Sequence, residues 1–94
     1  MGDIFAIGVC WHALGNLQCD RGNFDKAEAF LKKALSQMQY LGMTSCIAET
    51  NYDLAKLYRA KDNPTQAQEH YAIAHQMFTQ LGAEGDLRRL NEEW

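Results

Sequence analysis

The sequence contains a single proline among its 94 residues, only three cysteines and no excess of basic charge. Because proline interrupts helices, its near absence beside numerous Ala, Leu, Gln and Glu residues favours an all-α protein. The odd number of cysteines does not suit a disulfide framework and indicates a reducing compartment, so we predict a cytoplasmic protein. A net charge of -3 argues against nucleic acid as a partner, since a phosphate backbone requires a concentrated basic surface.

The chain also lacks a long apolar run. The stretch from Ile4 to Leu17 is apolar but shorter than a membrane span, and Asp3 stands before it where a signal peptide has basic residues. The opening MGDIFA places Ala6 where a myristoylation signal has Ser or Thr. We therefore predict no membrane partner.

Patterns that indicate catalysis or metal binding are absent as well. His70 and His75 lie five residues apart instead of the four that bring two metal ligands to one helix face. His12 and Cys19 can share a face, but no third residue of a catalytic triad accompanies them. Neither a glycine-rich phosphate loop nor a nucleophile elbow occurs. We predict no enzyme activity, no metal and no cofactor; a reactive-cysteine enzyme or sensor is the alternative that a thiol titration would test.

What the sequence does contain is a repeat with a period of 40 residues. A single period that aligns many apolar and small residues is the signature of a repeat protein. It divides the chain into units of residues 3–42 and 43–82. The identical residues at this spacing are Ile7 and Ile47, Leu14 and Leu54, Leu17 and Leu57, Asn23 and Asn63, Ala27 and Ala67, Ala34 and Ala74, Leu41 and Leu81, and Gly42 and Gly82.

Each unit is predicted to form two antiparallel helices separated by the turn-like stretches DRGN and KDNP. Asn63 followed by Pro64 is typical of an N-cap and first helical position. Gly42 and Gly82 suit left-handed stops at helix ends. The expected helices cover residues 3–20, 24–41, 44–61 and 64–81.

A last segment, residues 86–94, is predicted to be a capping helix. Asp86 can serve as its N-cap, and Leu87, Leu90 and Trp94 recur at helical spacing with charged residues between them. Such a helix covers the end of a stack with one face and meets water with the other.

The alternation of large and small residues predicts how the helices pack. Two helices can approach closely only where the side chains between them are small, and large side chains then fill the remaining volume. The small residues expected at these contacts are Gly15, Ala27, Ala34, Ala55, Ala67 and Ala74, and the large ones expected in the core are Trp11, Leu14, Phe24, Leu31, Tyr58 and Tyr71.

This arrangement resembles the tetratricopeptide repeat. The period exceeds the usual ~34 residues and is similar to the long variant of Leu-Gly-Asn repeat proteins, whose signature occurs literally at Leu14 to Asn16. A HEAT-like unit of this length fits the small residues less well. The sequence departs from the family pattern at Gln18 and Asn51. The family's places are filled by Trp11, Leu14, Gly15, Phe24, Ala27, Leu31 and Ala34, and then by Leu54, Ala55, Tyr58, Ala67, Tyr71 and Ala74.

The resemblance implies an α-solenoid of two antiparallel helix-pair units plus a C-terminal capping helix, used as a non-enzymatic scaffold that binds a protein or peptide ligand. The first helices of the units would line its groove. An Asn amide there can bond a peptide backbone, and a Lys and an Arg three residues apart can meet a carboxylate. The residues expected in this peptide-binding groove are His12, Asn16, Tyr52, Lys56 and Arg59.

Some members of the family hold a ligand's terminal carboxylate with a two-carboxylate clamp. Asn16 matches one clamp position, but His12 replaces a Lys and Asp53 stands where a second Asn would be. Because an acid there would repel a ligand carboxylate, we expect no binding of acidic chaperone-type tails.

The alternative function is structural, with repeats that only pack against neighbouring domains or another copy. The first helix is apolar around much of its circumference, with Ile4, Phe5, Ile7, Val9 and Leu17 among its residues. A terminal helix facing water should have a polar outer side. We therefore expect either a homo-oligomer formed through the first helix or a longer array of which this chain is a part.

Overall fold

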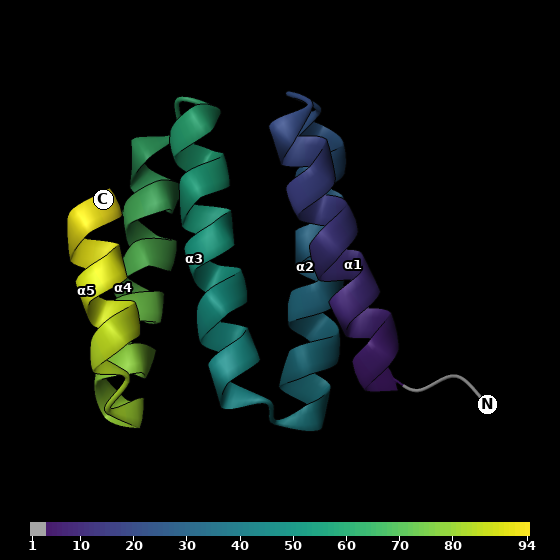
Figure 1. The fold of residues 1–94 in the computed structure, drawn as a ribbon. Coiled ribbons are helices and arrows are strands. Elements are labelled where there is room, and N and C mark those ends of the chain that lie inside the picture. The colour runs from purple at the N-terminus through teal and green to yellow at the C-terminus, as the bar shows by residue number, and fades with distance from the viewer. Residues whose placement is uncertain (1–3) are drawn as a thin grey trace.

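The computed structural model describes the backbone of residues 4–94 and the side chains of residues 10–94. Helices α1 and α2 form one antiparallel pair, α3 and α4 form a second, and α5 covers the end of the stack (Figure 1). Helices α1, α3 and α5 lie in front of α2 and α4 in this view. The all-α helical repeat is confirmed. The helices are α1 (Ile4–Asp20), α2 (Phe24–Leu41), α3 (Thr44–Ala60), α4 (Pro64–Leu81) and α5 (Glu84–Glu93).

The signals predicted for the end of α2 and for both ends of α4 act as expected. The side chain of Asn63 accepts a hydrogen bond from the backbone N–H of Gln66 at 3.3 Å. Gly42 and Gly82 adopt φ of 69° and 67° and end α2 and α4. The expected cap at Asp86 is wrong, because α5 begins two residues earlier, after Ala83.

Small residues lie where the helices touch. Ala27 and Ala34 are 0% exposed in the first unit, and Ala67 and Ala74 are 2% and 0% exposed in the second. The closest approach of α1 to α2 is at Gly15, where an added Cβ would come within 2.7 Å of a buried side chain on α2. This confirms the packing predicted from the repeat.

One pair of equivalent positions is occupied by chemically different side chains in the two units. In the first unit Trp11 stacks on Phe30, with ring centroids 5.4 Å apart. A shift of 40 residues puts Asn51 and His70 at these places, and His70 Nδ1 lies 2.9 Å from Asn51 Oδ1. The buried amide of Asn51 also donates to the Ile47 carbonyl at 2.9 Å. Asn51 can stand in the Trp place because its polar atoms are hydrogen bonded within the core.

One expectation about α1 is wrong, because Leu14, expected in the core, is 38% exposed. Cys10 on the same helix is exposed as well. Cys10, Cys19 and Cys46 are all free thiols. The side chains of residues 4–9, on which much of the predicted apolar surface rests, lie outside the described residues. None of the described helices combines the length and apolar character that crossing a membrane requires.

Candidate functional site

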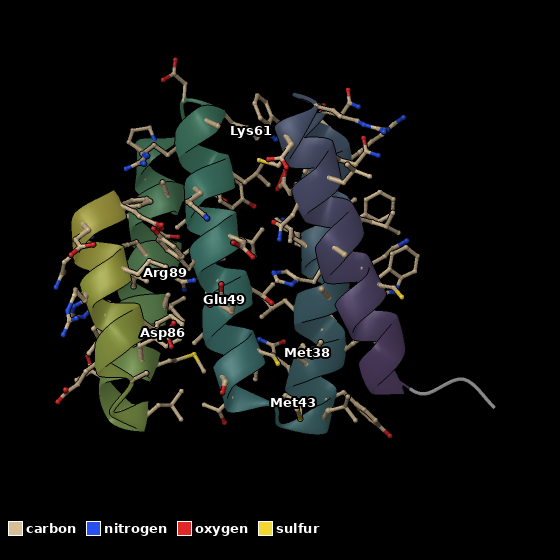
Figure 2. The ribbon with its side chains drawn as sticks, in the orientation of Figure 1. Met38, Met43, Glu49, Lys61, Asp86 and Arg89 are labelled. Atoms are coloured by element: carbon tan, nitrogen blue, oxygen red, sulfur yellow. The ribbon has the colours of Figure 1, made fainter. Side chains whose placement is uncertain are left out.

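The predicted site residues lie on the face formed by α1, α3 and α5, which we name the α1–α3–α5 face. His12 and Asn16 come from α1, and Tyr52, Lys56 and Arg59 come from α3. Side chains three and four residues apart share one side of a helix, so α3 presents one row along this face. The row consists of Glu49, Tyr52, Lys56 and Arg59. Figure 2 shows Glu49 of this row on α3, with Arg89 opposite it on α5.

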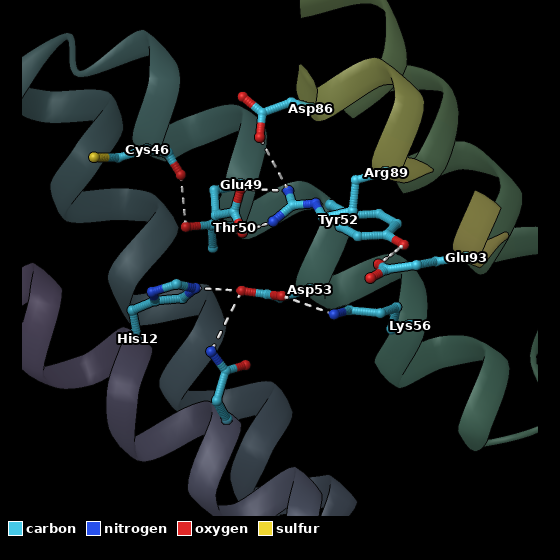
Figure 3. A network of polar contacts seen from close by, with 11 residues as sticks. His12, Cys46, Glu49, Thr50, Tyr52, Asp53, Lys56, Asp86, Arg89 and Glu93 are labelled. Carbon is cyan, nitrogen blue, oxygen red and sulfur yellow. Dashed lines mark hydrogen bonds and ion pairs between the residues drawn. The ribbon is translucent and has the colours of Figure 1, made fainter. Parts of the chain in front are cut away.

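A buried carboxylate connects α1 to α3 (Figure 3). Asp53 is only 7% exposed, and its Oδ2 is hydrogen bonded to His12 Nε2. The Nδ2 of Asn16 lies 3.5 Å from the same oxygen, and the Nζ of Lys56 lies 3.6 Å from Oδ1. Three neighbours thus compensate the charge of Asp53. The hydrogen bond to Asp53 raises the pKa of His12, although burial of the imidazole opposes this change.

A second set of polar contacts connects α3 to α5. The guanidinium of Arg89 donates to both oxygens of Glu49, at 3.2 and 2.8 Å, and lies 3.5 Å from Asp86. The hydroxyl of Tyr52 donates to Glu93 at 2.6 Å. Burial, followed by the Glu93 carboxylate, raises the pKa of Tyr52 well above its ordinary value. A two-pronged Arg–carboxylate contact fixes the orientation of α5 as well as its position.

Tyr52 is not open to a ligand, in contrast to the prediction from the sequence. Its side chain is 0% exposed. The ammonium of Lys56 lies 4.8 Å and the guanidinium of Arg89 lies 5.4 Å from its ring centroid, and the ring of Trp94 packs at 6.5 Å. The ammonium of Lys56 therefore lies over the ring, which attracts it by a cation–π interaction.

Arg59 is exposed but is held at the end of α5. Its guanidinium lies 4.4 Å above the ring of Trp94, and its Nη1 donates to the Trp94 carbonyl at 3.2 Å. Trp94 in turn stacks on Tyr71, with centroids 4.5 Å apart. Lys56 and Arg59 are thus positioned cations on one face, three residues apart.

From the sequence, Asp53 was placed on this face only as an acid that repels a carboxylate, and neither Asp53 nor Glu93 was identified as a hydrogen-bond acceptor. His12 pairs with Asp53 across 41 residues, and Tyr52 pairs with Glu93 across the same 41 residues. The second pair is the first one moved along the chain by one 40-residue repeat. The sequence therefore contained a signal for these contacts, namely a hydrogen-bond donor followed by an acid 41 residues later in both repeats.

The α1–α3–α5 face offers polar recognition rather than a deep cavity. A shallow depression of about 450 Å³ lies elsewhere, and none of the five predicted residues lines it. Within residues 10–94, no three His, Cys, Asp or Glu side chains come together as a metal ion would require. The depression is lined by Trp11, Lys32, Lys33, Ser36 and Gln37.

Comparison with known families agrees with this geometry. A family model described as tetratricopeptide repeat matches residues 7–80. No curated protein matches the chain.

Proposed function

Because the chain belongs to the tetratricopeptide repeat family, we propose that it is a non-enzymatic interaction module whose α1–α3–α5 face binds a peptide or protein segment. The observation that supports this proposal is the pair of positioned cations, Lys56 and Arg59, on that face. Lys56 is 46% exposed and Arg59 is exposed, so both can reach a ligand. The half-buried side chains of His12 and Asn16 continue the polar surface onto α1.

The chemistry of the face favours a ligand with an internal acidic side chain. Lys56 and Arg59 can donate charge-assisted hydrogen bonds to such a carboxylate. Asn16 can bond a peptide backbone, since its amide carries both a donor and an acceptor. A terminal carboxylate bound beside Asn16 would meet the like charge of Asp53, whose Oδ2 is hydrogen bonded to His12 and Asn16. We therefore propose that acidic C-terminal tails are not the ligands.

The second candidate function is structural. The contacts of Asp53 with α1 and of Glu49 with α5 join three helices, as expected of a segment that serves only to hold its neighbours. In this case the chain packs on adjacent domains or self-associates through α1. Either function is proposed for the cytoplasm, because free thiols persist in a reducing compartment.

Selection from a random peptide library separates the two functions. Peptides enriched on the wild-type protein are measured again on the double variant Lys56→Glu, Arg59→Glu. Loss of one charge-assisted contact is worth about 1.5–3 kcal/mol, so binding should weaken by roughly tenfold to a hundredfold. The double variant Lys26→Glu, Arg88→Glu carries the same change of charge at exposed positions on α2 and α5, and it should bind as the wild type does.

Melting temperatures decide how a loss of binding is interpreted. The control variant changes only exposed side chains and should melt close to the wild type. The variant Lys56→Glu, Arg59→Glu loses a cation beside the buried Asp53 and the contact of Arg59 with Trp94, so it should melt lower, and binding is compared at a temperature at which both variants are folded. Binding that is lost while the variant Lys56→Glu, Arg59→Glu is still folded supports the α1–α3–α5 face as the ligand site. Enriched peptides that bind both variants equally would favour the structural function.

A further inference from the structure

The internal repeat shows what normally covers one face of the first helix in each unit. On α3 this face consists of Thr50, Leu54 and Leu57, which are 1%, 0% and 0% exposed. Leu54 and Leu57 lie in one core cluster with Ala27 and Leu31 of α2. The face of α3 is therefore buried by the second helix of the preceding unit.

The equivalent face of α1 is open. A shift of 40 residues places Cys10, Leu14 and Leu17 at the positions of Thr50, Leu54 and Leu57. Cys10 is exposed, Leu14 is 38% exposed and Leu17 is 42% exposed. We name these three residues the open face of α1. Leucines are buried at the two equivalent positions one repeat later, so the exposed Leu14 and Leu17 form an apolar surface that lacks the cover found on α3.

A charged group at the edge of this face also lacks its counterpart. At the end of α3, Lys61 pairs with Asp25 at 3.0 Å and with Glu28 at 2.9 Å, both in the first turns of α2. The hydroxyl of Tyr58 also donates to Glu28, at 2.6 Å. Arg21 occupies the place of Lys61 in the first unit. Arg21 is exposed, and it makes no ion pair with any described side chain.

We propose that the open face of α1 binds a partner helix from outside residues 1–94 that resembles α2. The partner carries acidic residues in its first two turns, which meet Arg21, followed by an Ala and Leu stripe that covers Cys10, Leu14 and Leu17. This surface differs from the α1–α3–α5 face, and the proposal does not depend on the peptide ligand proposed for that face.

A second copy of this chain fits the open face less well. Its α2 is already covered by α3, and its α4 is covered by α5, whose Leu90 is 0% exposed. Helix α4 also has Thr65 and Gln68 where α2 has Asp25 and Glu28, so it offers no acid to Arg21 at these two places. The charge pattern thus selects an α2-like helix.

The thiol of Cys10 provides the assay, because a partner helix on the open face would shield it. The full chain with Cys19→Ser and Cys46→Ser retains Cys10 as its single thiol, and its alkylation is followed with and without a synthetic peptide of residues 24–41. At a peptide concentration ten times the dissociation constant, alkylation should slow by about tenfold. The control peptide carries Asp25→Lys and Glu28→Lys and should protect Cys10 much less.

A charge exchange tests the role of Arg21. In the variant Arg21→Glu, the peptide of residues 24–41 should lose most of its protection, and the Lys-substituted peptide should regain it. Arg88→Glu makes the same change at an exposed position on α5 and should leave both results unchanged. Restoration by the exchanged pair cannot arise from misfolding of either single variant.

A failure of the free peptide to protect Cys10 could reflect only the weak binding of a short helix. A linked form of the protein excludes this explanation. A copy of residues 24–40 placed ahead of Met1 provides an effective concentration in the millimolar range. Cys10 should then be protected and the melting temperature raised. Full reactivity of Cys10 in this linked form would overturn the proposal. Equal protection by a peptide of residues 64–81 would also overturn it, as would protection that rises with protein concentration alone, which identifies a second copy as the occupant.

Discussion

Replacing Gly15 with Ala tests whether α1 and α2 touch through a residue that lacks a side chain. The added Cβ would lie 2.7 and 2.8 Å from two carbons of Leu31 and 3.3 Å from the carbonyl oxygen of Ala27. Leu31 is 0% exposed, so it has no open space into which it can move. Overpacking of this kind costs about 1–3 kcal/mol, and the better helix propensity of Ala offsets about 1 kcal/mol of this cost. We expect a net destabilisation of about 0–2 kcal/mol.

Gly85→Ala is the matched control, because Gly85 also lies in a helix but has no atom within 4 Å of an added Cβ. Only the propensity gain applies there, so this variant should be as stable as the wild type or more stable. The difference in unfolding free energy between the two variants should be about 1–3 kcal/mol, or roughly 4–20 °C in melting temperature for a domain of this size. Thermal and urea unfolding followed by circular dichroism measures it. If Gly15→Ala stabilises as much as Gly85→Ala, the close approach of α1 and α2 is wrong.

Three further predictions concern single side chains. The hydroxyl of Tyr58, followed by Lys61, lowers the pKa of Glu28 from 4.5 to about 2, so the stability that Glu28 contributes is present above pH 4.5 and lost as the pH falls toward 2. Glu28→Gln should remove this part of the acid sensitivity in urea titrations, and an unchanged pH profile would contradict the pairing. The raised pKa of His12 has the opposite effect, since the stability that His12 contributes is fully present below pH 6.5 and is lost as the pH rises through the folded-state pKa. An NMR titration that gives the imidazole a pKa at or below 6.5 would refute this prediction. Asn63→Ala should cost about 0.5–2 kcal/mol through loss of the N-cap, whereas Asn63→Asp should retain most of the stability.

The sequence predicts the helices well because their ends are encoded locally. Asn63 and Pro64 begin α4, and Gly42 and Gly82 end α2 and α4, through interactions within a few residues of the chain. The start of α5 was misplaced because Asp86 is a good capping residue by type, yet the chain already turns at Ala83. The 40-residue period then predicts which helices lie together.

The candidate site was predicted only in part, because the burial of a side chain depends on elements far along the chain. Tyr52 was expected to be open, but Trp94 and Arg89 of the terminal helix region cover it. Leu14 was expected in the core as one of the large side chains that fill the volume between the helices, but it is 38% exposed, whereas its repeat equivalent, Leu54, is 0% exposed. The sequence shows that the two leucines are equivalent, but only the arrangement of helices shows that one of them lacks a covering neighbour.

Ligand recognition by the α1–α3–α5 face is the proposal on which the function depends. Two-dimensional amide NMR of the labelled chain, titrated with the tightest peptide from the library selection, tests it most directly. The largest shift changes should fall on α1, α3 and α5, centred on Asn16 and Lys56, and α2 and α4 should change little. Shift changes concentrated on α2 and α4 would contradict it.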